Sequence, residues 1–548
     1  MKQDVISPGV AAAAPRDLCA LEFSNRFVRE LPGDPDTRNV SRAVSDACYT
    51  RVDPTPVPAP RLLGWSDTVA ATLGIARPLD ACGPAAEALT GNRVLPGMQP
   101  YAARYGGHQF GQWAGQLGDG RAITLGEVIN AAGRSYELQL KGAGPTPYSR
   151  RADGRAVLRS SVREFMCSEA MHDLGVPTTR ALSLTATGAA VVRDLFYDGN
   201  PAPEPGAVVC RVAPSFVRFG NFQLHAAQGE GALLKRLADH VIAAHFPELL
   251  QDGGTPAAIY GRWFQEICRR TALMVNDWMR VGFVHGVMNT DNMSILGLTV
   301  DYGPYGWLEG YDPQWTPNTT DASGRRYCYA NQPQIAQWNL WQLANALYGL
   351  TEDKAPLEEG LVLFADTYES AWQKTLATKL GFAASSTVDA GLNAGLFSLL
   401  EATETDYTLF FRLLANVPVD DTAAALDDHA LVAPLQPAFY NEGAVSTPHR
   451  KRVATWLRDY IAHTQREATP SSQRIARMNA VNPKYVLRNY LAHLAIEALA
   501  AGDASVMERT MRVLQRPYDE QPGCDDLAAR RPEWARHKAG CSALSCSS

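Results

Sequence analysis

The sequence has no long hydrophobic run. None of its apolar stretches reaches the roughly 18 residues that a membrane-spanning helix needs. Its first residues, MKQDVISPGVAAAAPRD, contain an early aspartate and proline and no sustained apolar core, which argues against a secretory signal. We therefore expect a cytoplasmic protein with no membrane partner.

The sequence also lacks an excess of positive charge and a cysteine framework. A net charge of −6 argues against a general binder of nucleic acids. Ten cysteines scattered over 548 residues are typical of intracellular thiols rather than of a disulfide-rich fold. With 46% hydrophobic and 20% charged residues, the composition is that of an ordinary globular protein with room for more than one core.

The residues with the clearest chemistry lie in the segment 281–303, VGFVHGVMNTDNMSILGLTVDYG. We expect the apolar run 293–300 to form a short strand-like hairpin that brings Asp291, Asn292 and Asp301 to one point. Carboxylate and amide oxygens are the ligands that hard cations such as magnesium prefer. Taken alone, Asp-Asn pairs and D-x-G triplets are usually turns. The interpretation as a metal site therefore depends on the rest of the chain.

The same segment follows the pattern of the kinase motifs H-R-D-x-x-x-x-N and D-F-G. His285 takes the histidine place, Asn292 the asparagine place and Asp301 the aspartate place. Val287 stands where the catalytic aspartate should be, and a valine cannot accept a proton from a substrate hydroxyl. The pattern predicts metal binding without the usual base of phosphoryl transfer.

A glycine-rich loop precedes this segment in the chain. Gly115, Gly118 and Gly120 form a G-x-x-G-x-G loop that runs into Arg121 and a predicted strand at 122–128. Glycines allow backbone amides to approach an anion closely, and an arginine can bind phosphate oxygens with two donors. A tight turn is the simpler interpretation of such a loop when it stands alone.

Residues 136–141, YELQLK, alternate between apolar and polar side chains and predict a strand that ends at Lys141. A loop, a strand, a turn and a second strand ending in lysine follow one another in the small lobe of a kinase. In kinases this lysine pairs with a glutamate of the next helix, and Glu164 is the candidate here.

The segment 141–163 carries six basic residues against the single acid Asp153. We expect Asp153 to cap a helix that begins near Gly154. Such a helix would present arginines four residues apart on one face, at Arg155, Arg159 and Arg163. A solvated arginine face is the usual explanation. Beside a glycine loop in an acidic protein, the concentration of arginines favours a bound polyanion.

Two further arginines follow a predicted strand at 207–212. Arg211 and Arg218 are seven residues apart with few acidic residues nearby. They are either surface charges or groups that reach the same phosphates. The rest of the chain is mainly helical by its periodicity, and it includes a buried stripe at Trp263, Ile267, Thr271, Met274 and Trp278.

We expect four parts in the chain. Residues 1–60 are a flexible leader and N-terminal extension, and 61–222 form a β-rich lobe with the glycine loop, the strand lysine and the arginine-rich helix. Residues 223–520 form a helical lobe with the catalytic and metal-binding loops. Residues 521–548 are a tail with Cys541 and Cys546.

Together these motifs resemble the selenoprotein O family, a pseudokinase-like group of protein nucleotidyltransferases. The resemblance covers about residue 60 to the C-terminus and rests on YGGHQFGQWAGQLGDGRA, ELQLKGAGPTPYSRRADGRAVLRSSVREF, CRVAPSFVRFGNF, HGVMNTDNMSILGLTVDYGP, NQP and NPKYVLRNYL. It implies an α+β, protein-kinase-like bilobal fold with a small β-rich N-lobe and a large helical C-lobe. It also implies an inverted ATP and transfer of AMP to protein hydroxyls; related members are described as transferring UMP.

The resemblance also implies roles for single residues. Asp291 is the proton acceptor, and Asn292 and Asp301 bind Mg²⁺ or Mn²⁺. The nucleotide is held by Gly118, Gly120, Arg121, Lys141, Asp153, Gly154, Glu164, Arg211 and Arg218.

The family pattern includes a redox disulfide between the tail and the activation-loop region. Cys546 matches the family's tail, but the loop cysteine that the resemblance implies falls at Thr316. Cys546 could pair with Cys328 or with Cys541, or the tail thiols could be free.

Three functions are compatible with the sequence. The first is a protein adenylyltransferase acting on Ser, Thr or Tyr hydroxyls. The second is a metal-dependent phosphotransferase that uses Asp291 as base, which Val287 disfavours. The third is a non-catalytic nucleotide-binding redox scaffold. The predicted metal ligands disfavour it, because a scaffold has no need of them. All three predict ATP binding. The sequence leaves open ATP or UTP, the preferred cation, the protein substrates and the oligomeric state.

Overall fold

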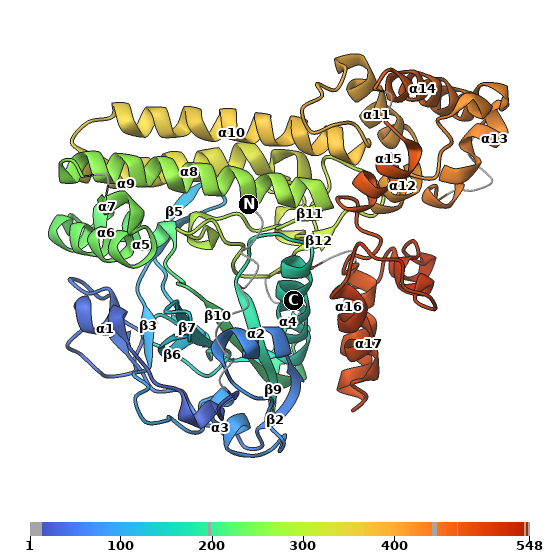
Figure 1. Ribbon diagram of the computed structural model, residues 1–548. Helices are drawn as coiled ribbons and strands as arrows, with labels where there is room; N and C mark the ends of the chain where they lie inside the picture. The colour runs from blue at the N-terminus through green and yellow to red at the C-terminus, as the bar shows by residue number, and fades with distance from the viewer. Residues whose placement is uncertain are drawn as a thin grey trace.

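A computed structural model describes residues 14–194, 199–251, 253–440, 446–467, 469–541 and 544–545. Within these ranges the protein is a mixed α/β molecule with an antiparallel sheet in its N-terminal part and many helices after it (Figure 1). Residues 1–13 of the predicted leader lie outside the described ranges. No helix in the described part of the chain is long and apolar enough to cross a membrane.

The main sheet has eight strands, and every ladder in it is antiparallel. Seven of them follow in the order β1 (Tyr49–Arg51), β3 (Tyr101–Ala103), β6 (Ala122–Ile129), β7 (Ser135–Lys141), β10 (Ala202–Ala213), β9 (Arg180–Arg193) and β2 (Arg61–Trp65). The eighth, β8 (Ala156–Val157), pairs with β10. Two short sheets stand apart, β4 (Gly106–Gln109) with β5 (Gln112–Gln116) and β11 (Phe283–Val284) with β12 (Gly306–Trp307).

Helices pack on both faces of the sheet, and further helices form the C-terminal part (Figure 1). Near the sheet lie α1 (Arg26–Glu30), α2 (Asp67–Leu73), α3 (Pro84–Thr90) and α4 (Leu158–Asp173). Helix α4 packs on one face of the sheet, and α2 and α3 pack on the other. The following part contains α5 (Phe219–Ala227), α6 (Gly231–His245), α7 (Glu248–Gln251), α8 (Pro256–Val281), α9 (Gln332–Thr351), α10 (Ala355–Lys379), α11 (Ala390–Ala402) and α12 (Tyr407–Leu414). The last helices are α13 (Asp428–Val432), α14 (Thr447–Arg466), α15 (Ser471–Asn479), α16 (Asn489–Ala500) and α17 (Ser505–Leu514).

The predicted stripe on α8 is confirmed. Its five side chains are at most 1% exposed, and α8 packs between α9 and α10 in the upper layer of Figure 1. Thr255 caps the helix through its side chain, and Gly282, with φ of +73°, ends it. The next residues run through β11 to the turn at His285, so α8 fixes where that turn lies.

Part of the N-terminal extension belongs to the core of the sheet. β1 pairs with β3 at the sheet edge. The ring of Phe27 stacks on Tyr101, with ring centroids 5.2 Å apart, and lies 5.9 Å from the ring of Tyr49. These rings bury an aromatic cluster between the extension and the sheet.

The predicted helix start near Gly154 is wrong. Helix α4 begins at Leu158, because residues 156–157 first pair with β10 as strand β8. Asp153 caps no helix; its carboxylate accepts from the Arg155 N–H (2.9 Å) and pairs with Arg193. The local capping pattern was outweighed by the sheet pairing that follows it.

The predicted strand-like hairpin at 293–300 is also wrong. The segment is a turn with two isolated bridges, one from Ser294 to Arg218 and one from Thr299 to Thr178. Gly297 has a φ of +70° and packs against the backbone of Arg270, which bends the chain. The apolar side chains are buried by helices and loops rather than by a strand partner.

Candidate functional site

A cavity of about 760 Å³ lies where the glycine loop of the sheet faces the turn after β11. Its wall is formed by residues 117–122 and 148–155, by side chains of β7, β9 and β10, and by residues 287–292 and 301–304. Ten of the twelve predicted site residues line it: Gly118, Gly120, Arg121, Lys141, Asp153, Gly154, Arg211, Asp291, Asn292 and Asp301. The other two, Glu164 and Arg218, contact residues of this group.

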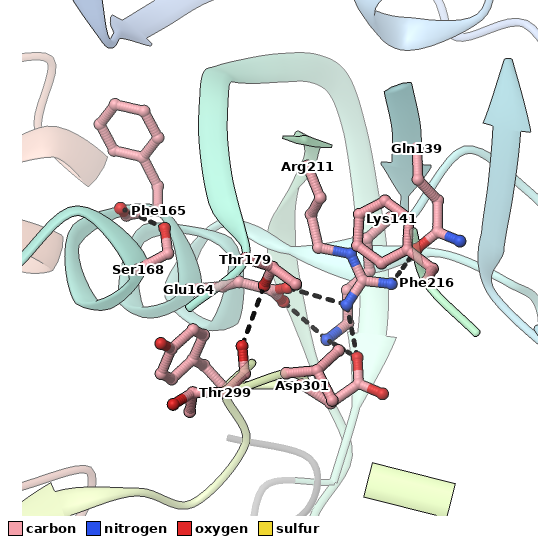
Figure 2. A network of polar contacts seen from close by, with 12 residues as sticks. Gln139, Lys141, Glu164, Phe165, Ser168, Thr179, Arg211, Phe216, Thr299 and Asp301 are labelled. Carbon is pink, nitrogen blue, oxygen red and sulfur yellow. Dashed lines mark hydrogen bonds and ion pairs between the residues drawn. The ribbon is translucent and has the colours of Figure 1, made fainter. Parts of the chain in front are cut away.

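Asp301 is the centre of a charge cluster (Figure 2). Its carboxylate pairs with Lys141 (Nζ–Oδ1 3.3 Å), with Arg211 and with Arg218. Glu164 on α4 lies behind them, 2.6 Å from the Lys141 ammonium and 3.2 Å from the Arg211 guanidinium. Three cations thus meet two carboxylates at the floor of the cavity, and the excess positive charge favours an anionic ligand.

This charge cluster determines the ionisation of its members. Burial alone would raise the pKa of Asp301, but Arg218, Lys141 and Arg211 hold it well below its usual range. Burial lowers the pKa of Lys141, whereas Glu164 and Asp301 act in the opposite direction. Asp301 also has a φ of +61°, a left-handed conformation that few residues other than glycine adopt.

Cross-strand pairing orients Arg211. Arg211 on β10 lies directly opposite Gln139 on β7 in the antiparallel ladder. The Gln139 side-chain oxygen accepts a hydrogen bond from the Arg211 guanidinium. The same guanidinium lies over the Phe216 ring, 5.0 Å from its centroid. Gln139 also donates to Thr124 (3.1 Å). The sequence analysis missed Gln139, although it stands two residues before Lys141 on the polar face of the predicted strand.

Asp291 lies on the opposite wall in a short 3₁₀ turn, residues 290–292. Its Oδ2 accepts from the Gln109 amide (3.2 Å), whereas its Oδ1 is buried and has no hydrogen-bond partner in the described part of the chain. Burial raises the pKa of Asp291 to about 6, against the effects of the Gln109 hydrogen bond and of the Arg218 charge. Arg218 also donates to the Asp291 backbone oxygen (2.7 Å).

The β4–β5 hairpin lies against this turn. The His108 N–H donates to Thr290 Oγ1 (2.7 Å), and the Phe110 N–H donates to Asn289 Oδ1 (3.2 Å). A Cβ on Gly107 would lie 2.6 Å from Asp291 Oδ1, so only glycine allows this close approach. The glycines in YGGHQFG were the available sequence signal for this close approach. A single sequence does not show contacts between residues about 180 positions apart.

The arginine-rich segment divides into two groups. Arg150, Arg151 and Arg155 line the cavity, and so does Arg193 from β9, which the sequence analysis missed. The two members of the predicted arginine face that lie on α4, Arg159 and Arg163, do not line the cavity. Arg159 pairs with Glu204 (2.8 Å), and Arg163 is 1% exposed and donates to the Tyr305 backbone oxygen (2.8 Å).

The site has oxygen atoms that suit a cation. Asp291 Oδ1 is a buried carboxylate oxygen for which the described residues provide no hydrogen-bond partner. The Asn292 amide nitrogen donates to the Val287 oxygen (2.9 Å), which leaves its amide oxygen as the potential ligand atom. No group of three or more His, Cys, Asp and Glu side chains suited to a metal occurs among the described residues. The donor set therefore fits a cation such as magnesium, which takes only one or two carboxylates and completes its shell with phosphates.

The predicted tail disulfide concerns Cys546, which lies outside the described residues. Cys328 and Cys541 are free and buried, and burial raises the pKa of the Cys541 thiol to about 11. Leu544 forms a parallel bridge with Asn318, so the tail does reach the loop between β12 and α9.

The comparisons with known proteins agree on one family. The family model described as "Protein adenylyltransferase SelO" matches residues 36–515. The chain is 63% identical over 550 residues to the protein nucleotidyltransferase YdiU of Nitrosospira multiformis, and the alignment covers 97% of each of the two chains. It is 58% identical to the protein of the same name from Aromatoleum aromaticum and 54% identical to that of Rhodopirellula baltica, over 96% of this chain and 99% of each relative. This chain therefore belongs to the protein adenylyltransferase SelO family.

Proposed function

We propose that this chain transfers AMP from ATP to hydroxyl groups of Ser, Thr or Tyr side chains of proteins and releases pyrophosphate. By its family the chain is a nucleotidyltransferase. The observation that carries the proposal is the cluster of Lys141, Arg211 and Arg218 on Asp301, opposite Asp291 Oδ1, which has no hydrogen-bond partner among the described residues. The cluster can hold a polyphosphate, and Asp291 offers a carboxylate to the attacking hydroxyl.

We assign a kinase-like, two-lobed architecture to the chain, with a β-rich N-lobe at 61–222 and a helical C-lobe at 223–520. The ion pair between the strand residue Lys141 and the helix residue Glu164 supports this assignment, because kinases place these two groups in the same way. The antiparallel sheet followed by many helices is compatible with it.

The nucleotide is held by backbone and cationic groups. A Cβ on Gly118 would lie 2.5 Å from the Tyr148 ring, and one on Gly154 would lie 2.2 Å from the Gly144 backbone, so both loops require glycine. Such loops expose backbone N–H groups to an anion. Arg121, Lys141 and Arg211 face the same cavity and bind the phosphates of an inverted nucleotide.

Asn292 and Asp301 would hold the cation, Mg²⁺ or Mn²⁺. When bound, it would neutralise charge on the phosphates of the nucleotide. Lys141, Arg211 and Arg218, which pair with Asp301, would lie near the same phosphates.

Asp291 accepts the proton of the acceptor hydroxyl. The hydroxyl oxygen forms a bond to the α-phosphorus, and the bond from the α-phosphorus to the bridging oxygen breaks, so that pyrophosphate leaves with the bonding electrons. Positive charge from Arg121, Lys141 and Arg211 stabilises the charge that develops on the leaving group. Val287 lines the cavity and offers no alternative acceptor for the proton.

Intact-mass spectrometry tests the proposal. The protein is incubated with ATP or UTP and with magnesium or manganese, alone and with candidate acceptor proteins. We expect a gain of about 329 Da per AMP, or of about 306 Da per UMP, and no gain with Asp301→Ala. Replacement of the exposed Asp503 by alanine is the control and should leave the gain unchanged. A gain of about 80 Da would mean phosphoryl transfer and would contradict the proposal.

A further inference from the structure

An aromatic cluster adjoins the cavity at Phe110, with exposed rings at Phe110, Trp113 and Trp341 and a buried ring at Tyr327. It runs from the tip of the β4–β5 hairpin over the loop before α9 onto that helix. We call it the aromatic rim, and it consists of Phe110, Trp113, Arg326, Tyr327, Trp338 and Trp341.

Ring contacts connect the members of the aromatic rim except Trp341. The rings of Phe110 and Tyr327 lie 5.2 Å apart, and the Arg326 guanidinium lies over both Tyr327 (5.8 Å) and Trp338 (4.7 Å). The His108 ring lies between Trp338 (5.5 Å) and Trp113 (5.1 Å). Trp341 follows Trp338 by one helical turn on α9.

Three rings of the aromatic rim face solvent. Phe110 is 37% exposed, Trp113 40% and Trp341 49%. Single exposed apolar residues are normal, but a contiguous group beside a cavity is typical of an interaction site. Aromatic side chains bury large areas at interfaces, and a guanidinium stacked on them adds to the contact. Phe110 also lines the cavity, so the rim adjoins the cavity at this residue.

Phe110 is held in a strained conformation. It has a φ of +50° and Gly111 a φ of +83°, in the two-residue turn between the paired residues Gln109 and Gln112. Such turns favour Asn-Gly, and the left-handed region is unfavourable for an aromatic residue. The Phe110 N–H donates to Tyr327 Oη (2.9 Å) and to Asn289, and these contacts keep the ring at the mouth. Strain of this kind is concentrated at binding and catalytic sites.

We propose that the aromatic rim binds an extended segment of the acceptor protein that carries an aromatic or large apolar side chain next to the modified hydroxyl. This inference rests on the proposed function, which requires an acceptor hydroxyl at Asp291. Gln109, which donates to Asp291, directly precedes Phe110 in the chain. A segment that delivers its hydroxyl to Asp291 therefore passes the hairpin tip and contacts the rim.

The test compares two short dye-labelled peptides that differ only beside a central serine, where one has tryptophan on both sides and the other glycine. Fluorescence anisotropy measures their binding to the full-length protein. We expect the tryptophan peptide to bind roughly tenfold more tightly, and Trp113→Ala or Trp341→Ala to weaken it about fivefold. Phe110→Gly relieves the backbone strain and removes the ring, and it should weaken binding equally without loss of the fold.

Tyr348→Ala is the matched control, because Tyr348 is a 53% exposed aromatic residue on the same helix outside the rim. Equal binding of the two peptides, or equal weakening by Tyr348→Ala, would overturn the proposal. A change in the sedimentation mass of Trp113→Ala would also overturn it, since the rim would then contact a second copy of the chain.

Mass spectrometry of the same peptides, incubated with ATP and cation, separates the docking surface from the reaction. If the tryptophan peptide binds at the rim but never gains AMP, the docking surface stands and the proposed function fails. If both peptides gain AMP at equal rates and the rim variants do not change these rates, the proposed function stands and the docking surface is wrong.

Discussion

Asp301 shows how much of this site depends on one side chain. Its carboxylate is the shared partner of three cationic groups, two of which belong to arginines with side chains 2% exposed. Buried charges of one sign are tolerated only next to a counter-charge. The carboxylate therefore holds the cavity together as well as serving as a potential cation ligand.

Asp301→Asn should reveal this structural contribution. The amide keeps the shape but removes the charge that pairs with Arg218 and leaves Arg211 with Glu164 alone, which should cost about 3 kcal/mol of unfolding free energy. ATP without added cation should restore part of the loss, because its phosphates supply the missing negative charge. Thermal unfolding with and without ATP measures both effects, with Asp503→Asn as control. An unchanged melting temperature would show that the cluster needs no counter-charge.

The buried Glu137 makes the stability of the folded protein depend on pH. It is 6% exposed on β7 and lies directly opposite Glu127 on β6. Burial, together with the Glu127 charge, raises the pKa of Glu137 from 4.5 to about 8. Between these two values the folded protein holds a proton that the unfolded chain has lost. The stability that this proton contributes is complete below the unfolded pKa and disappears as the pH rises through the folded one.

Glu137→Gln should therefore leave stability near pH 5 almost unchanged and increase it relative to the native protein as the pH rises toward 8. The difference should grow by roughly 1 kcal/mol per pH unit. Urea unfolding at several pH values in this window measures it, and the exposed Glu508→Gln is the control. A difference that does not depend on pH would mean that Glu137 is ionised in the folded protein.

Local patterns predicted some of these residues and not others. Lys141 ends an alternating strand and Asp301 follows an apolar run, so both could be predicted from the sequence. Gln139 and Arg211 meet only because β7 and β10 pair in one register. That register depends on the whole sheet, and a single sequence does not specify it.

At the scale of elements, the β4–β5 hairpin controls access to Asp291. Its apolar and polar residues do not alternate, and Gly106 and Gly107 serve close backbone approach. The sequence analysis found the glycine loop at 115–120 but not the hairpin before it. The start of α4 was missed for a related reason, because a short strand after Asp153 displaced the expected cap.

Gly107→Ala should move this hairpin. The new Cβ would lie 2.6 Å from Asp291 Oδ1 and 2.9 Å from the Asp291 Cβ, so the hairpin or the turn has to shift. A displacement of about 1 Å can lower kcat about 100-fold while the nucleotide still binds. Rates of AMP transfer and the ATP affinity would be measured together. Gly349→Ala on α9 is the control, because its Cβ would meet open space and its φ lies outside the left-handed region; an equal fall in kcat there would contradict the steric explanation.

At the scale of the whole molecule, the C-terminal tail and the catalytic turn are connected. The Leu544 N–H donates to Pro317 O (3.1 Å), and the Thr319 N–H donates to Leu544 O (2.8 Å). Between these two residues, Asn318 donates its side-chain amide to Gly286 O (3.0 Å), next to His285. A segment at the end of the chain thus supports the turn that leads to Asp291, although the motifs of that turn contain no sign of it.

Leu544→Asp should release the tail and loosen this turn. Leu544 is fully buried, and loss of its apolar contacts should cost roughly 2 kcal/mol locally, which corresponds to about thirtyfold faster amide exchange in the segment 316–320. Exchange should also increase around Gly286, and AMP transfer should slow, because the Asn318 contact is lost with the segment. Hydrogen–deuterium exchange read by mass spectrometry measures both regions. Leu79→Asp makes the same chemical change at a fully exposed position and should alter neither. If exchange rises in the tail alone while the turn stays protected, the tail is only a peripheral attachment and the turn is held by the core.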